Sequence, residues 1–143
     1  MKTIGLTDFP LQTFDKIRYS DTDRQGHVNN AVFSTYLETG RVELLYAAGL
    51  GLLSDTNSFV IAALNLNFRK EILWPGRVEI GTGVVKTGNS SINIYQQLFQ
   101  NGHCVASAET VIVQIDNASG KSQPLSEETR LALNSLLLNG AGD

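Results

Sequence analysis

The chain has 143 residues, of which 42% are hydrophobic and 17% are charged, and its formal net charge is -3. This composition is that of an ordinary globular protein and excludes a disordered chain. The 11 lysines and arginines are scattered along the sequence, so we expect no nucleic-acid partner.

The first predicted element is a short strand that ends near Tyr19, with Ile17 and Tyr19 on one face. A polar loop follows over residues 20–26, where abundant side-chain acceptors favour turns over regular structure. A long helix is then predicted from about Asn30 to Ala48, with Asn29 as its N-cap.

Apolar residues at helical spacing give this helix one buried stripe. The stripe consists of Phe33, Tyr36, Leu37, Gly40, Leu44, Ala47 and Ala48. Gly49 and Gly51 end the helix. Gly40 costs about 1 kcal/mol relative to alanine inside a helix, so we expect a sheet to approach the helix closely there.

After the helix the hydrophobic period changes from 3.6 to 2, which indicates strands. The first of these strands has an apolar face made of Val60, Ala62, Leu64, Leu66 and Phe68. Pro75-Gly76 and Gly88-Asn89 mark turns into the second and third strands. Their apolar faces are predicted from Val78, Ile80 and Val84, and from Ile92, Ile94 and Leu98.

Asn101-Gly102 favours a type I′ hairpin and leads into a fourth strand, from His103 to about Ile115. Ser126 is the expected cap of a last helix, with Glu127 and Glu128 in its first turn.

These elements predict an α+β fold with a long central helix packed on a five-stranded antiparallel sheet. No repeat or linker divides residues 1–143, so we expect a single domain. One amphipathic helix cannot cover both faces of the sheet, and the sheet edges stay open. We therefore expect a homodimer at least.

The lone cysteine, Cys104, excludes an internal disulfide and lies in an apolar stretch, where we expect it to be buried. The first residues lack the apolar segment of a signal peptide. No apolar run approaches the roughly 20 residues that cross a bilayer. We therefore expect a cytoplasmic protein without membrane contact.

The loop that opens the long helix carries two carboxylates, one imidazole and two amides: Asp21, Asp23, His27, Asn29 and Asn30. Free backbone N–H groups at a helix N-terminus favour negative charge. A thioester carbonyl placed there would be polarised, and one such donor is worth about 3 kcal/mol of barrier. Asp23 could attack the carbonyl carbon or activate a water, although such residues also serve as plain loop caps.

Four short stretches resemble the 4-hydroxybenzoyl-CoA thioesterase-like group of hotdog proteins. They are Asp21-Thr22-Asp23, Gly26-His27-Val28-Asn29-Asn30-Ala31, and Tyr36-Leu37-Glu38 with Arg41-Val42-Glu43. The order of the elements fits the hotdog fold over nearly the whole chain. The resemblance implies a catalytic carboxylate at Asp23, a polarising amide near Asn30, and dimers or tetramers with active sites at the subunit interface.

The loop is also similar to plant acyl-carrier-protein thioesterases, where Asp23 and His27 match but Gln25 replaces an asparagine. His27 is therefore a candidate base or positioning residue. Hotdog hydratases fit less well, because their aspartate and histidine are five residues apart. Another hotdog arrangement uses a mid-helix glutamate, and Glu38 and Glu43 are the available residues. We expect each to be a salt-bridging or solvated helix residue, with Arg41 as the partner of Glu38.

Coenzyme A carries phosphates, which cations and loop amides bind. The candidate residues for that contact are Arg69, Lys70, Lys86, Asn89, Ser90 and Ser91. We expect no separate cofactor, because coenzyme A would be part of the substrate. We also expect no metal site, because His27 and His103 are far apart and lack neighbouring ligands.

The sequence thus predicts hydrolysis of an acyl-CoA thioester to a free acid and coenzyme A, with Asp23 as nucleophile or general base. Two alternatives remain open at this point. The acyl donor could be an acyl-carrier protein, or the chain could be a hotdog protein that binds acyl groups without catalysis.

Overall fold

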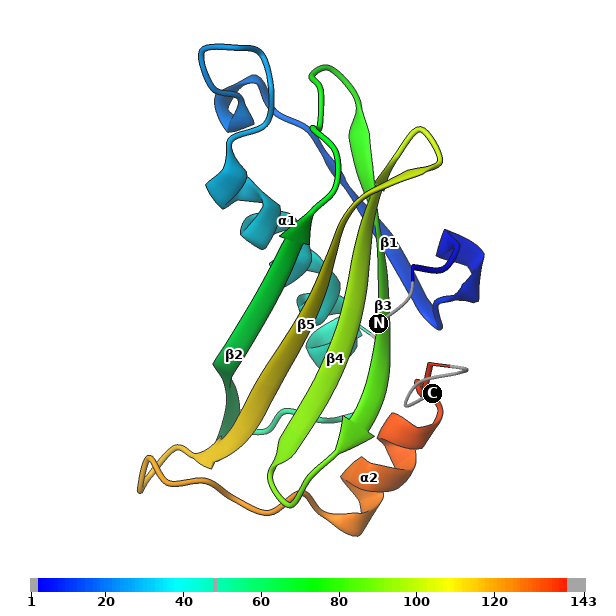
Figure 1. The fold of residues 1–143 in the computed structure, drawn as a ribbon. Coiled ribbons are helices and arrows are strands. Elements are labelled where there is room, and N and C mark those ends of the chain that lie inside the picture. Colours follow the sequence, from blue (N-terminus) through cyan, green and yellow to red (C-terminus); the bar gives the residue numbers. More distant parts are fainter. Residues whose placement is uncertain (1–2, 48, 139–143) are drawn as a thin grey trace.

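The computed structural model describes residues 3–47 and 49–138. Five strands form one antiparallel sheet in the order β1-β3-β4-β5-β2, and helix α1 crosses one face of it (Figure 1). The strands are β1 (Leu11–Lys16), β2 (Asn57–Phe68), β3 (Arg77–Thr87), β4 (Ser91–Gln100) and β5 (His103–Asp116). The helices are α1 (Asn30–Val42) and α2 (Glu127–Asn134). The predicted long helix on a five-stranded antiparallel sheet is confirmed.

Helix α1 begins as predicted, because Asn29 Oδ1 accepts a hydrogen bond from the Ala31 N–H at 3.0 Å. Its regular α-helical part ends at Val42, and a π-helical turn continues the chain over Glu43–Ala47. The predicted last residue, Ala48, lies outside the described residues.

Gly40 lies where α1 comes closest to the sheet. A Cβ atom at this position would be 2.5 Å from Gln96 Nε2, 2.6 Å from Thr82 Oγ1 and 2.7 Å from Ile80 Cγ2. No real Cβ contact is that short, so glycine is what allows this approach. The expected close contact between Gly40 and the sheet is therefore confirmed.

The core lies between α1 and the sheet. Phe33, Tyr36 and Leu37 of the helix are buried against strand residues that include Val78, Ile80 and Leu98. A second cluster continues toward the other end of the sheet. It includes Leu44, Leu52, Val84, Ile92, Ile94, Ile112 and Leu133.

The first strand differs from the prediction. It ends at Lys16, and the chain then makes a single 3-10 turn over Tyr19–Asp21. Ile17 is buried, whereas Tyr19 is 74% exposed, so the two residues do not share a face. The reason is local, since the Asp21 carboxylate accepts a hydrogen bond from the Arg18 N–H and draws the chain out of the strand.

Strand β2 carries a bulge that breaks the predicted alternation. The register with β5 shifts between Ile61 and Ala63. Before the shift, Phe59 packs on the core. After the shift, Leu66 packs on the core, and the Phe68 ring centroid lies 5.0 Å from that of Phe33. Val60 therefore does not share a face with Phe68, and the prediction of one continuous apolar face is wrong there.

The sheet face opposite α1 is partly covered by the chain's own ends. Phe9, just before β1, and Leu138, after α2, pack on Tyr95 and Phe99 of β4. The expectation that a second chain covers part of the sheet therefore applies mainly to the edge strand β2, where most residues are exposed.

Three predicted local signals are confirmed. Asn101 and Gly102 have φ angles of 52° and 81°, as a hairpin turn of this kind requires. Gly76 has a φ of 144° in the turn before β3. Ser126 caps α2, because its side chain accepts a hydrogen bond from the Thr129 N–H at 3.1 Å.

Cys104 is half-buried in β5 rather than fully buried, and its thiol donates to the Ala106 carbonyl at 3.4 Å. Burial raises the pKa of this thiol, although Arg69 acts in the opposite direction. No helix in the described part of the chain is long and apolar enough to cross a membrane.

Candidate active site

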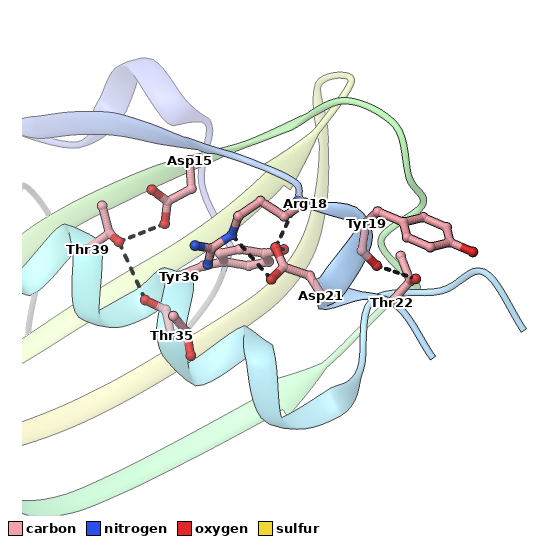
Figure 2. Close-up of polar contacts among 8 residues, drawn as sticks. All are labelled: Asp15, Arg18, Tyr19, Asp21, Thr22, Thr35, Tyr36 and Thr39. Carbon is pink, nitrogen blue, oxygen red and sulfur yellow. Dashed lines mark hydrogen bonds and ion pairs between the residues drawn. The ribbon is translucent and has the colours of Figure 1, made fainter. Parts of the chain in front are cut away.

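The two aspartates of the loop before α1 have opposite surroundings. Asp21 is buried, whereas Asp23 is exposed. Asp21 is only 5% exposed. Its Oδ2 accepts hydrogen bonds from the Tyr36 hydroxyl at 2.8 Å and from the Arg18 N–H at 2.9 Å (Figure 2). Asp21 therefore fastens the loop to α1, which leaves Asp23 free for another role.

These contacts shift the ionisation of both Asp21 and Tyr36. Burial alone would raise the pKa of Asp21, but the hydrogen bonds from Arg18 and Tyr36 and the Arg18 charge outweigh it and lower the pKa. Burial and the neighbouring Asp21 carboxylate raise the pKa of the Tyr36 phenol. The Asp21 carboxylate therefore stays ionised in the folded protein.

Replacing Asp21 with asparagine is expected to flatten the dependence of stability on acid pH. An aspartate whose pKa is lower in the folded than in the unfolded protein stabilises the fold at pH values above its unfolded pKa, about 3.9. This stabilisation disappears as the pH falls through the lower pKa of the folded protein. Urea unfolding at pH 7 and pH 3 measures the effect. The exposed Asp55→Asn is the control, and equal pH dependence in the wild type and Asp21→Asn would contradict this role.

Asp23 sits in a tight turn that uses only one of its carboxylate oxygens. Its Oδ1 accepts hydrogen bonds from the Gln25 N–H at 2.8 Å and the His27 N–H at 3.3 Å. The Asp23 N–H donates to the His27 carbonyl at 2.8 Å, and Gly26, with a φ of 82°, completes the turn. Oδ2 has no hydrogen-bond partner in the described part of the chain, so it can face a ligand.

Asp23 lines a pocket of ≈ 420 Å³ between the loop, the start of α1 and the end of β2. The lining residues are Asp23, Gln25, His27, Val28, Asn30, Phe33, Phe68, Arg69, Lys70 and Glu71. The three predicted catalytic positions, Asp23, His27 and Asn30, are thus brought together with two of the predicted cations.

One backbone donor at the N-terminus of α1 is left unpaired, and it belongs to a residue that lines the pocket. The Ala31 N–H is satisfied by the Asn29 side chain, and the Val32 N–H donates to the Asn29 carbonyl at 2.9 Å. The Asn30 N–H, in contrast, donates to no residue that the structure describes. It is therefore available to polarise a carbonyl oxygen.

The His27 ring has a partner, Glu71, that the sequence pattern does not reveal. Its Nε2 lies 3.1 Å from Glu71 Oε2, on the connection between β2 and β3. The two residues are far apart in the sequence, and no local motif pointed to Glu71. The preceding cations, Arg69 and Lys70, line the same pocket, and their N–H groups share the Val105 carbonyl.

The connection that carries Glu71 is fastened to the centre of the sheet. Gln100, at the end of β4, accepts a hydrogen bond from the Leu73 N–H at 3.0 Å and donates to the Leu73 carbonyl at 2.7 Å. The Gln100 side chain thus takes the place of a neighbouring strand. In addition, the Val28 N–H donates to the Ile72 carbonyl at 2.8 Å, which ties the loop to the same wall.

The remaining coenzyme A candidates lie elsewhere in the chain. The β3–β4 turn lies beside α2, at the opposite end of the sheet from the loop before α1 (Figure 1). Arg130 of α2 donates to the carbonyls of Gly88 and Asn89 at 2.7 and 3.1 Å. The structure of this chain therefore does not bring Lys86, Asn89, Ser90 and Ser91 to the pocket. Their role in coenzyme A binding stays a prediction.

The helix glutamates do not line the pocket among the residues that the structure describes. Glu38 is exposed, and Glu43 accepts a hydrogen bond from the Thr13 hydroxyl at 3.4 Å. Arg41 is buried, and its Nη1 has no hydrogen-bond partner within the described chain. Burial lowers the pKa of Arg41, while the Glu38 charge raises it without a direct ion pair between the two described residues.

No group of three or more potential metal ligands occurs within residues 3–47 and 49–138. The expectation of a site without metal or cofactor stays a prediction. The chemistry that this pocket offers directly is that of a free carboxylate oxygen, an imidazole and an unpaired helix N–H.

Comparison with known proteins identifies relatives over most of the chain. The sequence profile described as the thioesterase-like superfamily matches residues 17–133. Among curated proteins, the uncharacterised protein YsmA of Bacillus subtilis strain 168 is 25% identical over 146 residues. That match covers 93% of this chain and 97% of YsmA.

Several solved structures are similar. A thioesterase of Thermus thermophilus, crystallised with coenzyme A and Zn, is 30% identical with a TM-score of 0.78, covering 90% of this chain and 95% of that one. A predicted thioesterase of Bacillus stearothermophilus is 26% identical with a TM-score of 0.80, covering 88% and 95%. The probable thioesterase YbaW of Escherichia coli is 26% identical with a TM-score of 0.76, covering 88% and 98%.

Proposed function

The chain belongs to the thioesterase-like superfamily and has its hotdog fold, and from this we propose that it hydrolyses an acyl-CoA thioester to a free acid and coenzyme A. Family membership supports thioester hydrolysis as the reaction type. The observation that carries the proposal is that one pocket is lined by Asp23, whose Oδ2 is free, and by Asn30, whose N–H is unpaired among the described residues.

In the proposed reaction the Asn30 N–H donates to the thioester carbonyl oxygen. Negative charge grows on that oxygen as the tetrahedral intermediate forms, and the helix dipole favours it. One such donor is worth about 3 kcal/mol of barrier. The Asn29 cap keeps this donor free, because it satisfies the next N–H of the helix instead.

Asp23 acts at the carbonyl carbon in one of two ways. As a general base, Oδ2 takes a proton from a water whose oxygen attacks the carbon, and the intermediate then expels the coenzyme A thiolate. As a nucleophile, Oδ2 attacks directly and forms an acyl anhydride, which water hydrolyses in a second step. In both cases the thiolate leaves and takes up a proton.

Coenzyme A is proposed as the acyl carrier for two reasons. The Thermus thermophilus relative was crystallised with coenzyme A. In this chain Arg69 and Lys70 supply two cations at the pocket wall, where they can bind phosphate oxygens. A small anionic carrier needs only such a local pair of cations. An acidic carrier protein would need a broad basic surface, which the lysines and arginines scattered along the sequence do not indicate.

Thiol release from a panel of short, long and aromatic acyl-CoAs tests the proposal. We expect the wild type to turn over at least one member. Turnover of acyl-carrier-protein thioesters alone would replace coenzyme A as the carrier, and tight acyl-CoA binding without turnover would favour a non-catalytic acyl-binding protein. The cytoplasmic location expected from the sequence stays a prediction.

We infer that a second copy of the chain pairs along β2. This edge strand exposes large apolar side chains: Val60, Ile61, Leu64 and Phe68. A long apolar edge of unpaired backbone groups is a template for another strand. Because Phe68 and Arg69 also line the pocket, the second subunit would lie beside it. A dimer and a tetramer built from such dimers are both compatible with this edge.

Replacing Leu64 with lysine is expected to convert the dimer to a monomer. The ammonium would be buried in the subunit interface without a partner, which costs several kcal/mol. Light scattering after size exclusion measures the mass. Leu131→Lys, on an exposed site of α2, is the matched control and should remain a dimer. A monomeric wild type, or an unchanged mass for Leu64→Lys, would exclude pairing along β2.

A further inference from the structure

A carboxylate outside the proposed reacting groups contacts the imidazole of the pocket. His27 Nε2 and Glu71 Oε2 are 3.1 Å apart, with side chains 36% and 49% exposed. Pairs this exposed contribute only about 0–1 kcal/mol to stability. Stabilisation of the fold is therefore a weak reason for this contact, and its place in the pocket suggests a different one.

Backbone contacts hold both partners in place. His27 and Leu73 form an isolated antiparallel bridge, and the Val28 N–H donates to the Ile72 carbonyl. Gln100 fixes the Leu73 backbone in turn through two hydrogen bonds. The segment that places the Glu71 carboxylate beside the ring is therefore held by backbone hydrogen bonds, unlike a free surface loop.

A carboxylate at one nitrogen of an imidazole determines where the ring proton resides. With Nε2–H donating to Glu71, the neutral ring keeps its lone pair on Nδ1. The same histidine donates its backbone N–H to Asp23 Oδ1. His27 therefore connects Glu71 to the turn that presents the Asp23 carboxylate.

We propose that Glu71 is a positioning residue that acts through His27, holding the imidazole in one orientation and one tautomer beside the thioester. In this proposal Glu71 acts on the imidazole ring, and not on the thioester or the attacking water. This inference rests on the proposed thioesterase function for its catalytic consequence, but the fixed tautomer is a property of the protein alone.

Steady-state kinetics of Glu71→Gln on the best acyl-CoA of the panel test the catalytic consequence. We expect kcat to fall about 10- to 100-fold, with little change in KM and an unchanged melting temperature. Glu79→Gln is the matched control, because Glu79 is also a partly exposed carboxylate paired with a cation, Arg77, at 3.5 Å. It should keep the wild-type kcat.

A double-mutant cycle separates positioning from a simple charge effect. If Glu71 acts through His27, adding Glu71→Gln to His27→Gln lowers kcat no further. If the Glu71 charge only repels the phosphates of coenzyme A, removing it lowers KM to the same degree with or without His27. An additive loss of kcat, or an unchanged kcat in Glu71→Gln, would overturn the proposal.

Nitrogen NMR of the imidazole gives a readout that does not depend on turnover. The neutral His27 ring should be the Nε2–H tautomer in the wild type and a mixture of tautomers in Glu71→Gln. A wild-type ring that is already mixed would overturn the positioning role. A fixed tautomer in a protein that hydrolyses no acyl-CoA would instead remove the proposed function and leave the positioning of His27 standing.

Discussion

Replacing Asp23 with asparagine is expected to lower kcat for the acyl-CoA substrate by about 10²-fold or more. The amide oxygen of asparagine can still accept the hydrogen bonds from the Gln25 and His27 N–H groups, so the turn should keep its shape. What the variant lacks is the negative charge on the second oxygen. An amide neither attacks a thioester readily nor takes a proton from water.

Thiol release measured beside thermal unfolding separates a chemical loss from a structural one. The melting temperature of Asp23→Asn should match that of the wild type, because no hydrogen bond of Oδ2 to the described residues is removed. Asp55→Asn, at an exposed loop position, is the control and should keep full activity. Undiminished turnover by Asp23→Asn would exclude Asp23 as base and as nucleophile.

Replacing Gly40 with alanine is expected to destabilise the protein by about 1–3 kcal/mol. Alanine would be favoured by about 1 kcal/mol within an isolated helix, so the sign of the effect tests the packing. The added methyl group would meet Gln96, Thr82 and Ile80 at distances that no real contact shows. All three side chains are fully buried, so none of them can swing out into solvent to make room.

Urea unfolding measures this cost. Thr35→Ala serves as the control, because it changes helix propensity at an exposed position of the same helix. We expect Thr35→Ala to be neutral or slightly stabilising. If Gly40→Ala were as stable as the wild type, α1 would not be seated against β3 and β4 as closely as described.

Local rules account for the parts of the fold that could be predicted from the sequence. The Asn29 cap, the Asn101-Gly102 turn and the Ser126 cap each depend on residues within three positions of one another. Gly40 was predictable for a related reason, since a glycine inside an apolar stripe indicates a close neighbour. These features follow from the backbone requirements of single residues.

Strand β2 shows where the sequence pattern is insufficient. Apolar residues occupy successive positions from Phe59 to Leu64, so either set of alternate residues could be taken as the buried one. The bulge between Ile61 and Ala63 exchanges the two sets midway along the strand. Its position depends on pairing with β5, which a linear pattern does not contain.

The candidate site divides in the same way. That Asp23, His27 and Asn30 lie together was predictable, because one short motif carries all three; their catalytic roles stay a prediction. The place of Glu71 was not predictable, because its contact with His27 depends on how the β2–β3 connection folds back over the loop. Nor could the sequence reveal that Lys86 lies at the far end of the sheet from Lys70, since both are only cations near turns.

The hydrogen bonds from Gln100 to Leu73 have a consequence for how ligands reach the pocket. They tie the wall that carries Glu71 to β4, a central strand, so this wall can move only if both Gln100 hydrogen bonds break. The facing wall is a short exposed turn over residues 23–26, closed mainly by the hydrogen bonds of Asp23. We therefore expect the turn over residues 23–26, and not the opposite wall, to move when substrate enters and product leaves. The Asp23 carboxylate, which is proposed to act on the substrate, would then move with that turn.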